Sequence, residues 1–392
     1  MTEKQRILVL TPAIGRRGGG VSEAARLYAE AVLADGRFDL EVVTLMDADF
    51  ETDRDAWPDI PIHAFKSYGP ARYGFSPGML RYVVGVRAAT VHVHGIWTFH
   101  VFCAALWSLL RRRPALVTPH GMLEHWILQR SPRLKAAVST LYQQRFLRSA
   151  DLHVLTEKEK ADVAAAGLPT ARCHVIPNYV LPFAEVAKRP GWWRPEFAER
   201  RVYLFLGRIH DKKGWRELCA AWDELSSTDP SFRDSAQLVF CGWPDDCPDF
   251  EPTIEALHER FGNALFAGPQ YGVDRDRSLA AADIFLLPSK SEGLPMSVLE
   301  AWAAGVPCMM TRACNLDQGF DAGAAFETRE SAESIATTLR GLQARTTKDL
   351  NRASLAAKSL VAEKFSQKNV GQQLSDLFQD LITKQSKRLY RD

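Results

Sequence analysis

Residues 285–311 read FLLPSKSEGLPMSVLEAWAAGVPCMMT, and this stretch decides the fold class. It begins with an apolar run that closes at Pro288, which is typical of a buried parallel strand ending in a loop. A helical pattern starts at Pro295, because proline suits the first helical turn, and Gly305 ends it. A buried strand followed by a loop and a helix indicates an α/β protein with a parallel sheet.

Two carboxylates flank the start of this helix. Glu292 lies just before the helix N-terminus, and Glu300 lies inside the helix. Their separation is a little over two turns at ~3.6 residues per turn, so both side chains can point to one side. Free N–H groups at a helix N-terminus suit a phosphate, and carboxylates accept hydrogen bonds from sugar hydroxyls. The spacing alone equally allows Glu292 to be a helix cap and Glu300 a solvent-exposed residue.

The frame PSKSEGLPMSVLEAWAAGVP over 288–307 resembles the E-x7-E motif of retaining, GT-B-fold glycosyltransferases of family 4, the glycosyl transferases group 1. The resemblance covers nearly the whole chain and is strongest in 207–214 and 287–307. HGIW and TPHGMLEHW, within 92–97 and 118–126, resemble a branch that acts in bacterial surface-polysaccharide synthesis. The family implies an α/β GT-B fold: two Rossmann-like domains whose parallel sheets face each other across a cleft, with a C-terminal helix that crosses back to the first domain.

The domain organisation follows from length and from the Pro-rich stretches. A chain of 392 residues is too long for one ordinary core, so two domains are expected. We predict an N-terminal domain over 1–182 on the acceptor side, and a linker over 183–200. The second domain, over 201–368, would bind the donor, and the crossing helix would occupy 369–392.

Composition narrows the class of protein. The chain is 46% hydrophobic and 24% charged, which is ordinary for a globular protein, and no apolar run reaches the ~18 residues of a membrane span. Its seven cysteines lack C-x-x-C spacing, which argues for a reducing compartment. The N-terminus is typical of a first strand and not of a signal peptide. We therefore expect a cytoplasmic protein.

The first strand, over 6–11, leads into a Gly- and Arg-rich loop and then a helix from Val21. Strand, Gly-rich turn and helix is the opening of a Rossmann-like unit with an anion site at the helix N-terminus. The spacing is not G-x-G-x-x-G, so a dinucleotide site is not indicated. The family resemblance places Gly19 and Gly20 near the donor diphosphate; the alternative is a plain tight turn.

The second half restarts with a strand over 201–206, followed by cations in the next loop. Arg208 can fork two phosphate oxygens, and Lys213 supplies a point charge. GRIHDKKG over 207–214 resembles the family's pyrophosphate-binding element. The resemblance implies that Arg208, Lys213 and Glu292 act in catalysis and that Glu300 binds the ribose. The backbone donors that it implies in the donor site are those of Gly207, Gly293, Leu294 and Met296, whereas Pro295 has no N–H to offer.

Histidines end two strands of the first half. His94 and His120 are each followed by glycine, and ligands sit at the carboxyl ends of parallel strands. His92 and His94 share one face of a strand and could bind a metal, but no third ligand is evident, and buried hydrogen-bonded histidines are commoner. In the resembled family, His120 would face the donor sugar across the interdomain cleft, which makes it the leading catalytic candidate of this half; a helix-capping or core histidine is the alternative. The acceptor-side candidates are His94, Glu124 and Asn178.

Charge is distributed unevenly along the chain. The formal net charge is +2, but residues 60–150 carry twelve Lys or Arg and a single acid, Glu124. Basic amphipathic helices in this region could lie on an anionic membrane or receive an anionic acceptor; ordinary Arg-rich solvent-facing surfaces are the alternative. No nucleic-acid recognition module accompanies the charge. We expect contact of 60–150 with the inner face of the cytoplasmic membrane, and no nucleic-acid partner.

The resemblance implies a retaining glycosyltransferase that moves a hexose-type sugar from a UDP- or GDP-sugar to a glycan or lipid-linked acceptor in polysaccharide or lipopolysaccharide biosynthesis. We expect no metal and no cofactor, because the two cations can stabilise the leaving diphosphate. Two rivals remain open: a nucleotide-sugar epimerase on the same fold, and a non-catalytic protein that binds membranes or polyanions.

Overall fold

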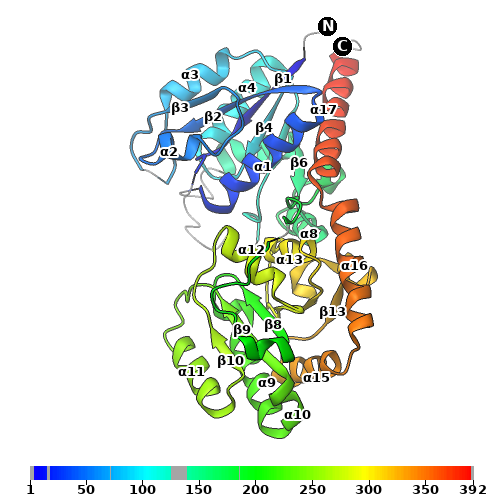
Figure 1. The fold of residues 1–392 in the computed structure, drawn as a ribbon. Coiled ribbons are helices and arrows are strands. Elements are labelled where there is room, and N and C mark those ends of the chain that lie inside the picture. Colours follow the sequence, from blue (N-terminus) through cyan, green and yellow to red (C-terminus); the bar gives the residue numbers. More distant parts are fainter. Residues whose placement is uncertain (1–3, 16–17, 71, 125–138, 185, 390–392) are drawn as a thin grey trace. The chain divides into compact units, whose positions relative to one another are not determined.

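The computed structural model describes residues 4–15, 18–70, 72–124, 139–184 and 186–389 (Figure 1). The chain forms two compact units. The N-terminal unit comprises Met1–Tyr179 together with Gln367–Asp392, and the C-terminal unit comprises Val180–Ser366.

The N-terminal unit is built on a seven-stranded, all-parallel sheet. Its strand order is β3-β2-β1-β4-β5-β6-β7, so the order reverses between β1 and β4. Apolar runs such as Ile7 to Leu10 are buried on both faces, as parallel strands covered by helices require. The strands are β1 Gln5–Leu10, β2 Phe38–Leu45, β3 Ile62–Phe65, β4 Thr90–His94, β5 Ala115–Thr118, β6 Asp151–Val154 and β7 Cys173–Val175.

Helices connect these strands, and the C-terminal helix α17 Gln367–Leu389 packs beside α1 Gly19–Asp35 (Figure 1). A Cβ on Gly371 would lie 2.3 Å from the Ala31 carbonyl oxygen, so only glycine lets the two helices approach this closely. The apolar face of α17 is buried in the core of the N-terminal unit. The other helices are α2 Phe50–Arg54, α3 Pro77–Gly85, α4 Phe99–Arg111, the π-helical turn η2 Ser139–Gln143, α7 Gln144–Ser149, α8 Glu157–Ala165 and the short η3 Thr170–Arg172.

The C-terminal unit has a six-stranded parallel sheet with the order β10-β9-β8-β11-β12-β13, which reverses between β8 and β11. The strands are β8 Arg201–Leu206, β9 Ala236–Cys241, β10 Ala264–Phe266, β11 Ile284–Leu287, β12 Cys308–Met310 and β13 Ala325–Glu327. The helices are α9 Trp215–Thr228, α10 Pro230–Ser235, α11 Phe250–Phe261, α12 Val273–Ala280, α13 Met296–Ala303, α14 Asp317–Asp321, α15 Ala332–Gln343 and α16 Thr347–Lys364, with short η4 Pro195–Glu199, η5 Asp211–Lys213 and η6 Arg312–Cys314. The prediction of two α/β units on parallel sheets is confirmed.

The segment 183–200, which the sequence predicts as a linker, belongs to the C-terminal unit. Trp192 and Phe197 are buried in the core of that unit, and the indole N–H of Trp192 donates to Ser278 Oγ at 2.9 Å. The prolines that suggest a linker lie in a segment whose aromatic side chains pack inwards.

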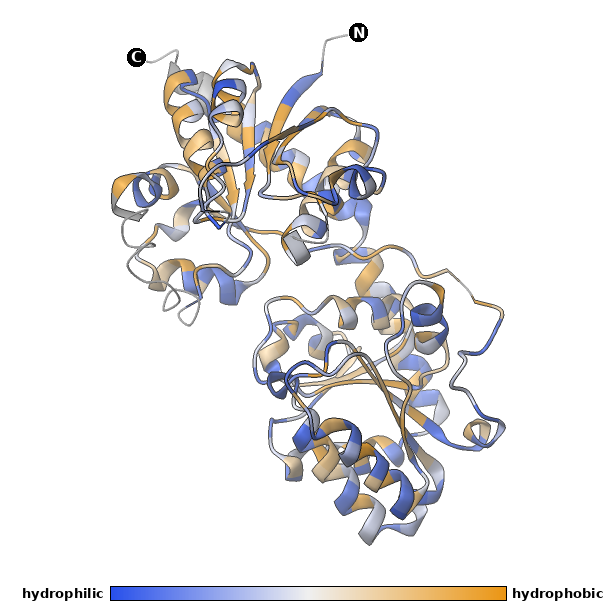
Figure 2. Cartoon of the chain, turned by 90° about the vertical axis from the view of Figure 1, so that its left-hand side faces the viewer, coloured by the Kyte–Doolittle hydropathy of each residue, from blue (hydrophilic) through white to orange (hydrophobic). Residues whose placement is uncertain are grey.

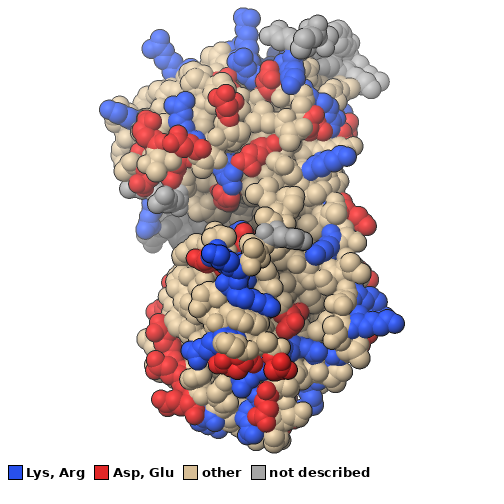
Figure 3. Space-filling view, viewed as in Figure 1, with Lys and Arg blue, Asp and Glu red and all other residues tan. Residues whose placement is uncertain are grey.

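Hydrophobic residues concentrate in the strands of both sheets, while the helices carry mixed faces (Figure 2). The face drawn in Figure 3 intersperses Lys and Arg with Asp and Glu over both units. Within the described ranges, every helix is either too short or too polar to span a lipid bilayer.

Candidate active site

Two neighbouring strands of the C-terminal unit deliver the predicted donor-site residues. β8 and β11 pair directly, and the strand order reverses between them. In open parallel sheets, ligands bind outside the carboxyl ends of the strands at such a switch point. Arg208 and Lys213 follow the end of β8, and Glu292 follows the end of β11. The sheet therefore gathers two cations and a carboxylate at its ligand-binding edge.

Lys213 and Glu292 form a nearly buried ion pair. Lys213 Nζ lies 2.7 Å from Glu292 Oε1, and their side chains are 15% and 8% exposed. Ser289 Oγ donates to the same carboxylate oxygen at 2.6 Å. Glu292 is therefore not a cap of α13, the alternative that the spacing alone allowed.

Gly214 brings the two loops together. Its φ of 74° lies in the left-handed region, and a Cβ there would lie 2.1 Å from the Pro288 carbonyl oxygen. The backbone N–H of Lys290 then donates to the Lys212 carbonyl at 2.8 Å. The glycine of the GRIHDKKG element thus permits the close backbone contact that places Lys213 next to Glu292.

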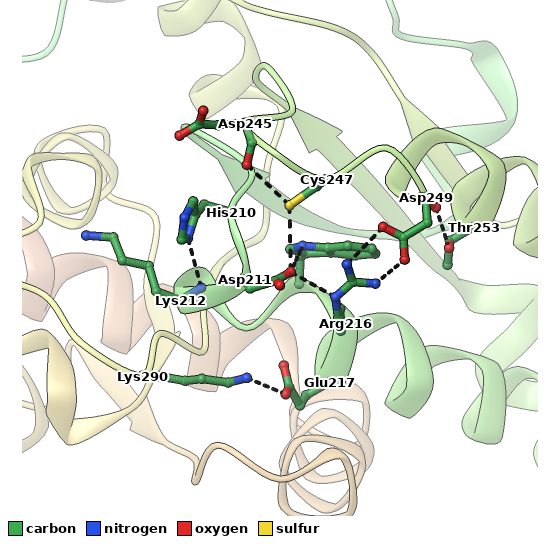
Figure 4. A network of polar contacts seen from close by, with 11 residues as sticks. His210, Asp211, Lys212, Arg216, Glu217, Asp245, Cys247, Asp249, Thr253 and Lys290 are labelled. Atoms are coloured by element: carbon green, nitrogen blue, oxygen red, sulfur yellow. Dashed lines mark hydrogen bonds and ion pairs between the residues drawn. The ribbon is translucent and has the colours of Figure 1, made fainter.

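A polar network holds the loop that carries these cations (Figure 4). Asp211 accepts from the Trp215 indole at 3.1 Å and from Arg216 Nε at 2.8 Å. The Arg216 guanidinium also pairs with Asp249, at the start of α11, and lies over the Trp215 ring. Cys247 lies 3.6 Å from Asp211. These contacts fix η5 to α9 without engaging Arg208 or Lys213.

Arg208 lies nearer the surface than Lys213. Its NH1 contacts Asp245 Oδ2 at 2.9 Å, and the two side chains are 40% and 43% exposed. Asp245 belongs to the loop after β9, which pairs with the Arg208 loop through the bridge between Ile209 and Pro244. Because the pair is solvent-accessible, an anionic ligand can compete with Asp245 for the guanidinium.

The segment after Thr311 holds the Glu292 loop in place. Asn315 Nδ2 donates to the carbonyls of Glu292 at 2.6 Å and Gly293 at 3.0 Å, and the Glu292 N–H donates to the Ala313 carbonyl at 3.0 Å. Sequence reasoning assigned no role to 312–326, because an asparagine that supports a loop across twenty-odd residues has no local motif.

Helix α13 begins one residue later than the apolar pattern suggests, with Pro295 at its N-cap. Gly293 is exposed with open space around it, while Leu294 and Met296 are partly buried against the core. Glu300 Oε1 pairs with Arg275 NH1 of α12 at 2.7 Å. The partner of Glu300 is therefore Arg275, which lies outside the E-x7-E motif.

Two exposed aromatic residues lie at the ends of neighbouring strands of this sheet. Trp243 follows β9 and Tyr271 follows β10, and they are 44% and 67% exposed. Their rings stack with centroids 6.3 Å apart. The signal for them in the sequence is an aromatic residue in the loop that follows each strand.

In the N-terminal unit, Gly19 and Gly20 form the first turn of α1. Among the described residues, nothing lies within 4 Å of a Cβ built on either glycine, so this part of the structure leaves the helix N-terminus open to an approaching group. The helix has no side-chain cap at Gly18. Its free N–H groups can therefore receive an anion.

His120 and His94 meet at the carboxyl ends of β5 and β4. Their rings are stacked, and His94 Nδ1 lies 3.1 Å from His120 Nε2. His92 and His153 both contact the Thr118 hydroxyl, at 2.8 and 3.0 Å. Buried, hydrogen-bonded histidines therefore fill this edge, and no group of His, Cys, Asp or Glu in the described part of the chain has the arrangement of a metal site.

The other acceptor-side candidates lie close to these rings. The Tyr28 hydroxyl donates to Asn178 Oδ1 at 2.5 Å, and the Tyr28 ring stacks on His94 with centroids 6.0 Å apart. Glu124 lies beside Gly121 and pairs with Lys158 at 3.6 Å. His94 and Glu124 thus adjoin the His120 turn, and Asn178 is linked to it through Tyr28 and His94.

Glu159 is a site residue that sequence reasoning missed. Its two carboxylate oxygens accept from the backbone N–H groups of Gly121 at 2.6 Å and Leu155 at 2.7 Å. Burial raises the pKa of Glu159. The turn that it holds includes His120, whose φ of 54° is rare for a non-glycine residue. The T-x-x-E pattern from Thr156 indicates only a local helix cap, and nothing in it predicts the contact with Gly121.

The buried histidines predict acid sensitivity. Burial lowers the pKa of His100 and of His153 to about 4. His120 is only partly buried, but burial lowers its pKa to about 3. These groups stay neutral in the native protein but bind protons in the unfolded chain below a pH of about 6.5. Stability is therefore full above that pH and falls below it, by about 1.4 kcal/mol per pH unit for each histidine.

Urea unfolding between pH 7.5 and 5 measures this loss. His153→Asn removes one such group, so the slope of the free energy of unfolding against pH should fall by the amount that corresponds to about one proton. This expectation holds whatever the effect of the substitution on stability at pH 7.5. A free energy of unfolding that stays constant over the range would contradict the assignment of neutral, buried imidazoles.

Residues 125–138, which include Trp126, Arg130, Arg133 and Lys135, lie outside the described residues. The end of the TPHGMLEHW element and much of the predicted basic amphipathic region are therefore not part of the site described above.

In a comparison with known proteins, each of the two units matches a family of glycosyltransferase domains. Residues 19–179 match the family described as "Glycosyl transferase 4-like domain", and residues 200–344 match "Glycosyl transferases group 1". The chain is 29% identical over 178 residues to mannosylfructose-phosphate synthase of Agrobacterium fabrum, covering 42% of this chain and 38% of that protein. It is 28% identical over 188 residues to alpha-galactosylglucosyldiacylglycerol synthase of Streptococcus pneumoniae, covering 45% and 48%. Both matches span less than half of the relative's length.

The fold is shared with solved structures of the same architecture. The crystal structure of Anabaena HepE in complex with UDP and glucose has a TM-score of 0.68 at 18% identity, covering 96% of this chain and 100% of that one. The fold is therefore GT-B, and because the two family models together match well over half of the chain, one on each unit, the protein belongs to the group 1 glycosyltransferases.

Proposed function

We propose that this protein is a retaining glycosyltransferase that moves a hexose-type sugar from a UDP- or GDP-sugar to a hydroxyl of a glycan or lipid-linked acceptor in polysaccharide or lipopolysaccharide biosynthesis. The observation that carries the proposal is the nearly buried pair of Lys213 and Glu292, with Arg208 on the same loop as Lys213, at the switch point between β8 and β11. Family membership supports the reaction class, and a glycolipid synthase among the relatives supports a lipid-linked acceptor.

The transition state of such a transfer has a cationic sugar and a departing diphosphate that gains negative charge. Arg208 and Lys213 would stabilise the diphosphate, and preorganised donors of this kind are worth about 3 kcal/mol each. We expect these two cations to make a metal unnecessary, so turnover should persist in a chelator.

Glu292 would accept hydrogen bonds from the donor sugar. Its Oε1 is already bound by Lys213 and Ser289, which orients the carboxylate as an acceptor and not as an attacking group. This favours same-face attack, in which the leaving phosphate takes the proton of the acceptor hydroxyl, over double displacement through Glu292.

The nucleotide would extend along the same sheet edge. The stacked pair of Trp243 and Tyr271 offers apolar faces to a base, and Glu300 beside Arg275 offers a carboxylate to ribose hydroxyls. The HepE structure holds UDP, so UDP is the first nucleotide to test.

The N-terminal unit would bind the acceptor at its own strand-end edge. His94, Glu124 and Asn178 supply polar groups around His120, and we propose that His120 acts from this side on a sugar hydroxyl. A neutral imidazole suits this role, because it can donate one hydrogen bond and accept another near pH 7.

A thermal-shift screen over UDP, GDP, ADP and their sugars tests the donor assignment. A nucleotide at about 100 times its dissociation constant stabilises the native state by about 2.7 kcal/mol, so one nucleotide should raise the melting temperature clearly. No shift with any of them would contradict the proposal. Isotope exchange at the sugar without an acceptor would identify an epimerase instead.

A further inference from the structure

We infer that the N-terminal unit has a second binding site, a cavity at the amino ends of its strands that takes the phosphate headgroups of an anionic membrane. The cavity has a volume of about 1080 Å³. It is bounded by the end of α4, by η2 and α7, by the starts of β5, β6 and β7, and by α17. This inference goes beyond the transfer reaction and does not depend on it.

The cavity lies at the edge of the sheet opposite His94 and His120. Arg113 and Pro114 precede β5, whereas His120 follows it. The four residues of β5 separate these edges by about 13 Å at ~3.3 Å per residue. The cavity is therefore not part of the acceptor edge around His120.

Its lining has an excess of positive charge. The basic side chains are those of Arg112, Arg113, Arg145, Arg172 and Lys384. Asp151, the one acid among the described lining residues, is engaged by His174 at 2.8 Å. Within the described ranges, neither Arg113 nor Arg145 has a carboxylate partner. Lys384 pairs with Asp380 at 3.7 Å. Arg113 and Arg145 are therefore the lining cations whose charge is left to complement phosphate groups.

Its rim is apolar and exposed. Leu109 and Leu141, which line the cavity, are 72% and 81% exposed, and the neighbouring Leu110 is 58% exposed. Single exposed leucines are common, but leucines grouped around a basic cavity form the amphipathic surface that membrane interfaces attract. A soluble phosphate ligand would need the cations and not the leucines, so the two together favour a bilayer.

Flotation with vesicles tests this inference on the full chain, without donor. We expect binding to phosphatidylcholine vesicles that contain about one third phosphatidylglycerol, weaker binding at high salt, and none to pure phosphatidylcholine. Each Arg near an anionic surface contributes about fivefold, so Arg113→Gln with Arg145→Gln should weaken binding about 25-fold. Leu109→Ser with Leu141→Ser should also weaken it, with little change in its salt dependence.

The matched control is Arg54→Gln with Arg81→Gln, which removes the same charge from exposed positions of the same unit outside the cavity. This control should bind like the unchanged protein. Equal loss in both Arg pairs would assign binding to overall charge and overturn the cavity site. If the protein does not float with the anionic vesicles, a membrane is not the occupant of the cavity. The same conclusion would follow if the vesicles had no effect and glycerol phosphate raised the melting temperature. All variants carry exposed or cavity-lining changes, and matching melting temperatures confirm that they fold.

Discussion

Lys213→Met is expected to lower the free energy of unfolding by about 3 kcal/mol and to abolish donor turnover. The side chain of Glu292 is 8% exposed, so removal of the ammonium leaves a nearly buried carboxylate with Ser289 as its remaining side-chain partner. Breaking a buried ion pair from one side costs 3–5 kcal/mol, because the other charge stays desolvated. Thermal and urea unfolding measure the first effect, and release of nucleoside diphosphate from the stabilising donor measures the second.

The double variant Lys213→Met with Glu292→Gln separates stability from catalysis. With both charges gone, most of the lost stability should return, because a neutral amide tolerates burial better than an unpaired carboxylate. Turnover should remain lost, since neither the cation nor the carboxylate is available to the donor. Lys290→Met is the matched control. Lys290 lies on the same loop as Glu292 but pairs with Glu217 at the surface, where the two side chains are 38% and 25% exposed. Its loss is therefore expected to lower the free energy of unfolding by less than about 1 kcal/mol.

A double variant as unstable as Lys213→Met would show that the lysine contributes through packing and not through its charge. A Lys213→Met protein with unchanged turnover would remove Lys213 from the proposed donor site.

The sequence predicts the fold because its signals are local. The apolar run closed by Pro288 and the proline at the start of α13 each act over a few residues, and the structure confirms the two parallel-sheet units. The two loops with cations and carboxylates were also identified from sequence, since GRIHDKKG and the E-x7-E frame are contiguous motifs. The contact between Lys213 and Glu292 depends on the pairing of β8 with β11. Neither sequence motif contains information about this strand pairing.

The residues that sequence reasoning missed act across long distances in the chain. Asp245 pairs with Arg208 from the loop after β9, Arg275 pairs with Glu300 from α12, and Asn315 holds Glu292 from beyond β12. Each makes a contact that depends on tertiary structure and has no spacing rule. The linker predicted over 183–200 illustrates the same limit, because Pro-rich composition signals irregular backbone whether the aromatic residues within it are buried or exposed.

Arg208→Ala is expected to lower turnover by about 100-fold or more while leaving stability nearly unchanged. The ion pair of Arg208 with Asp245 is about 40% exposed on both sides, and pairs of this kind contribute about 0–1 kcal/mol to folding. In the transition state, however, the guanidinium would face a diphosphate that gains charge, and loss of one preorganised donor costs 100- to 1000-fold. Arg208→Lys keeps the charge but not the fork, so about a tenfold loss is expected.

Asp245→Asn provides the opposing test. In the free protein, Asp245 holds Arg208, so a donor diphosphate must displace this carboxylate to reach the guanidinium. Removing its charge should therefore tighten donor binding, whereas Arg208→Ala should weaken it. Calorimetric titration with the nucleotide measures the dissociation constant of each variant and shows whether binding is tightened or weakened. If Asp245→Asn weakened binding as Arg208→Ala does, Asp245 would orient the arginine for the donor and not compete with it. If Arg208→Ala folded normally and turned over at the unchanged rate, the diphosphate would have to bind elsewhere than at the β8–β11 switch point.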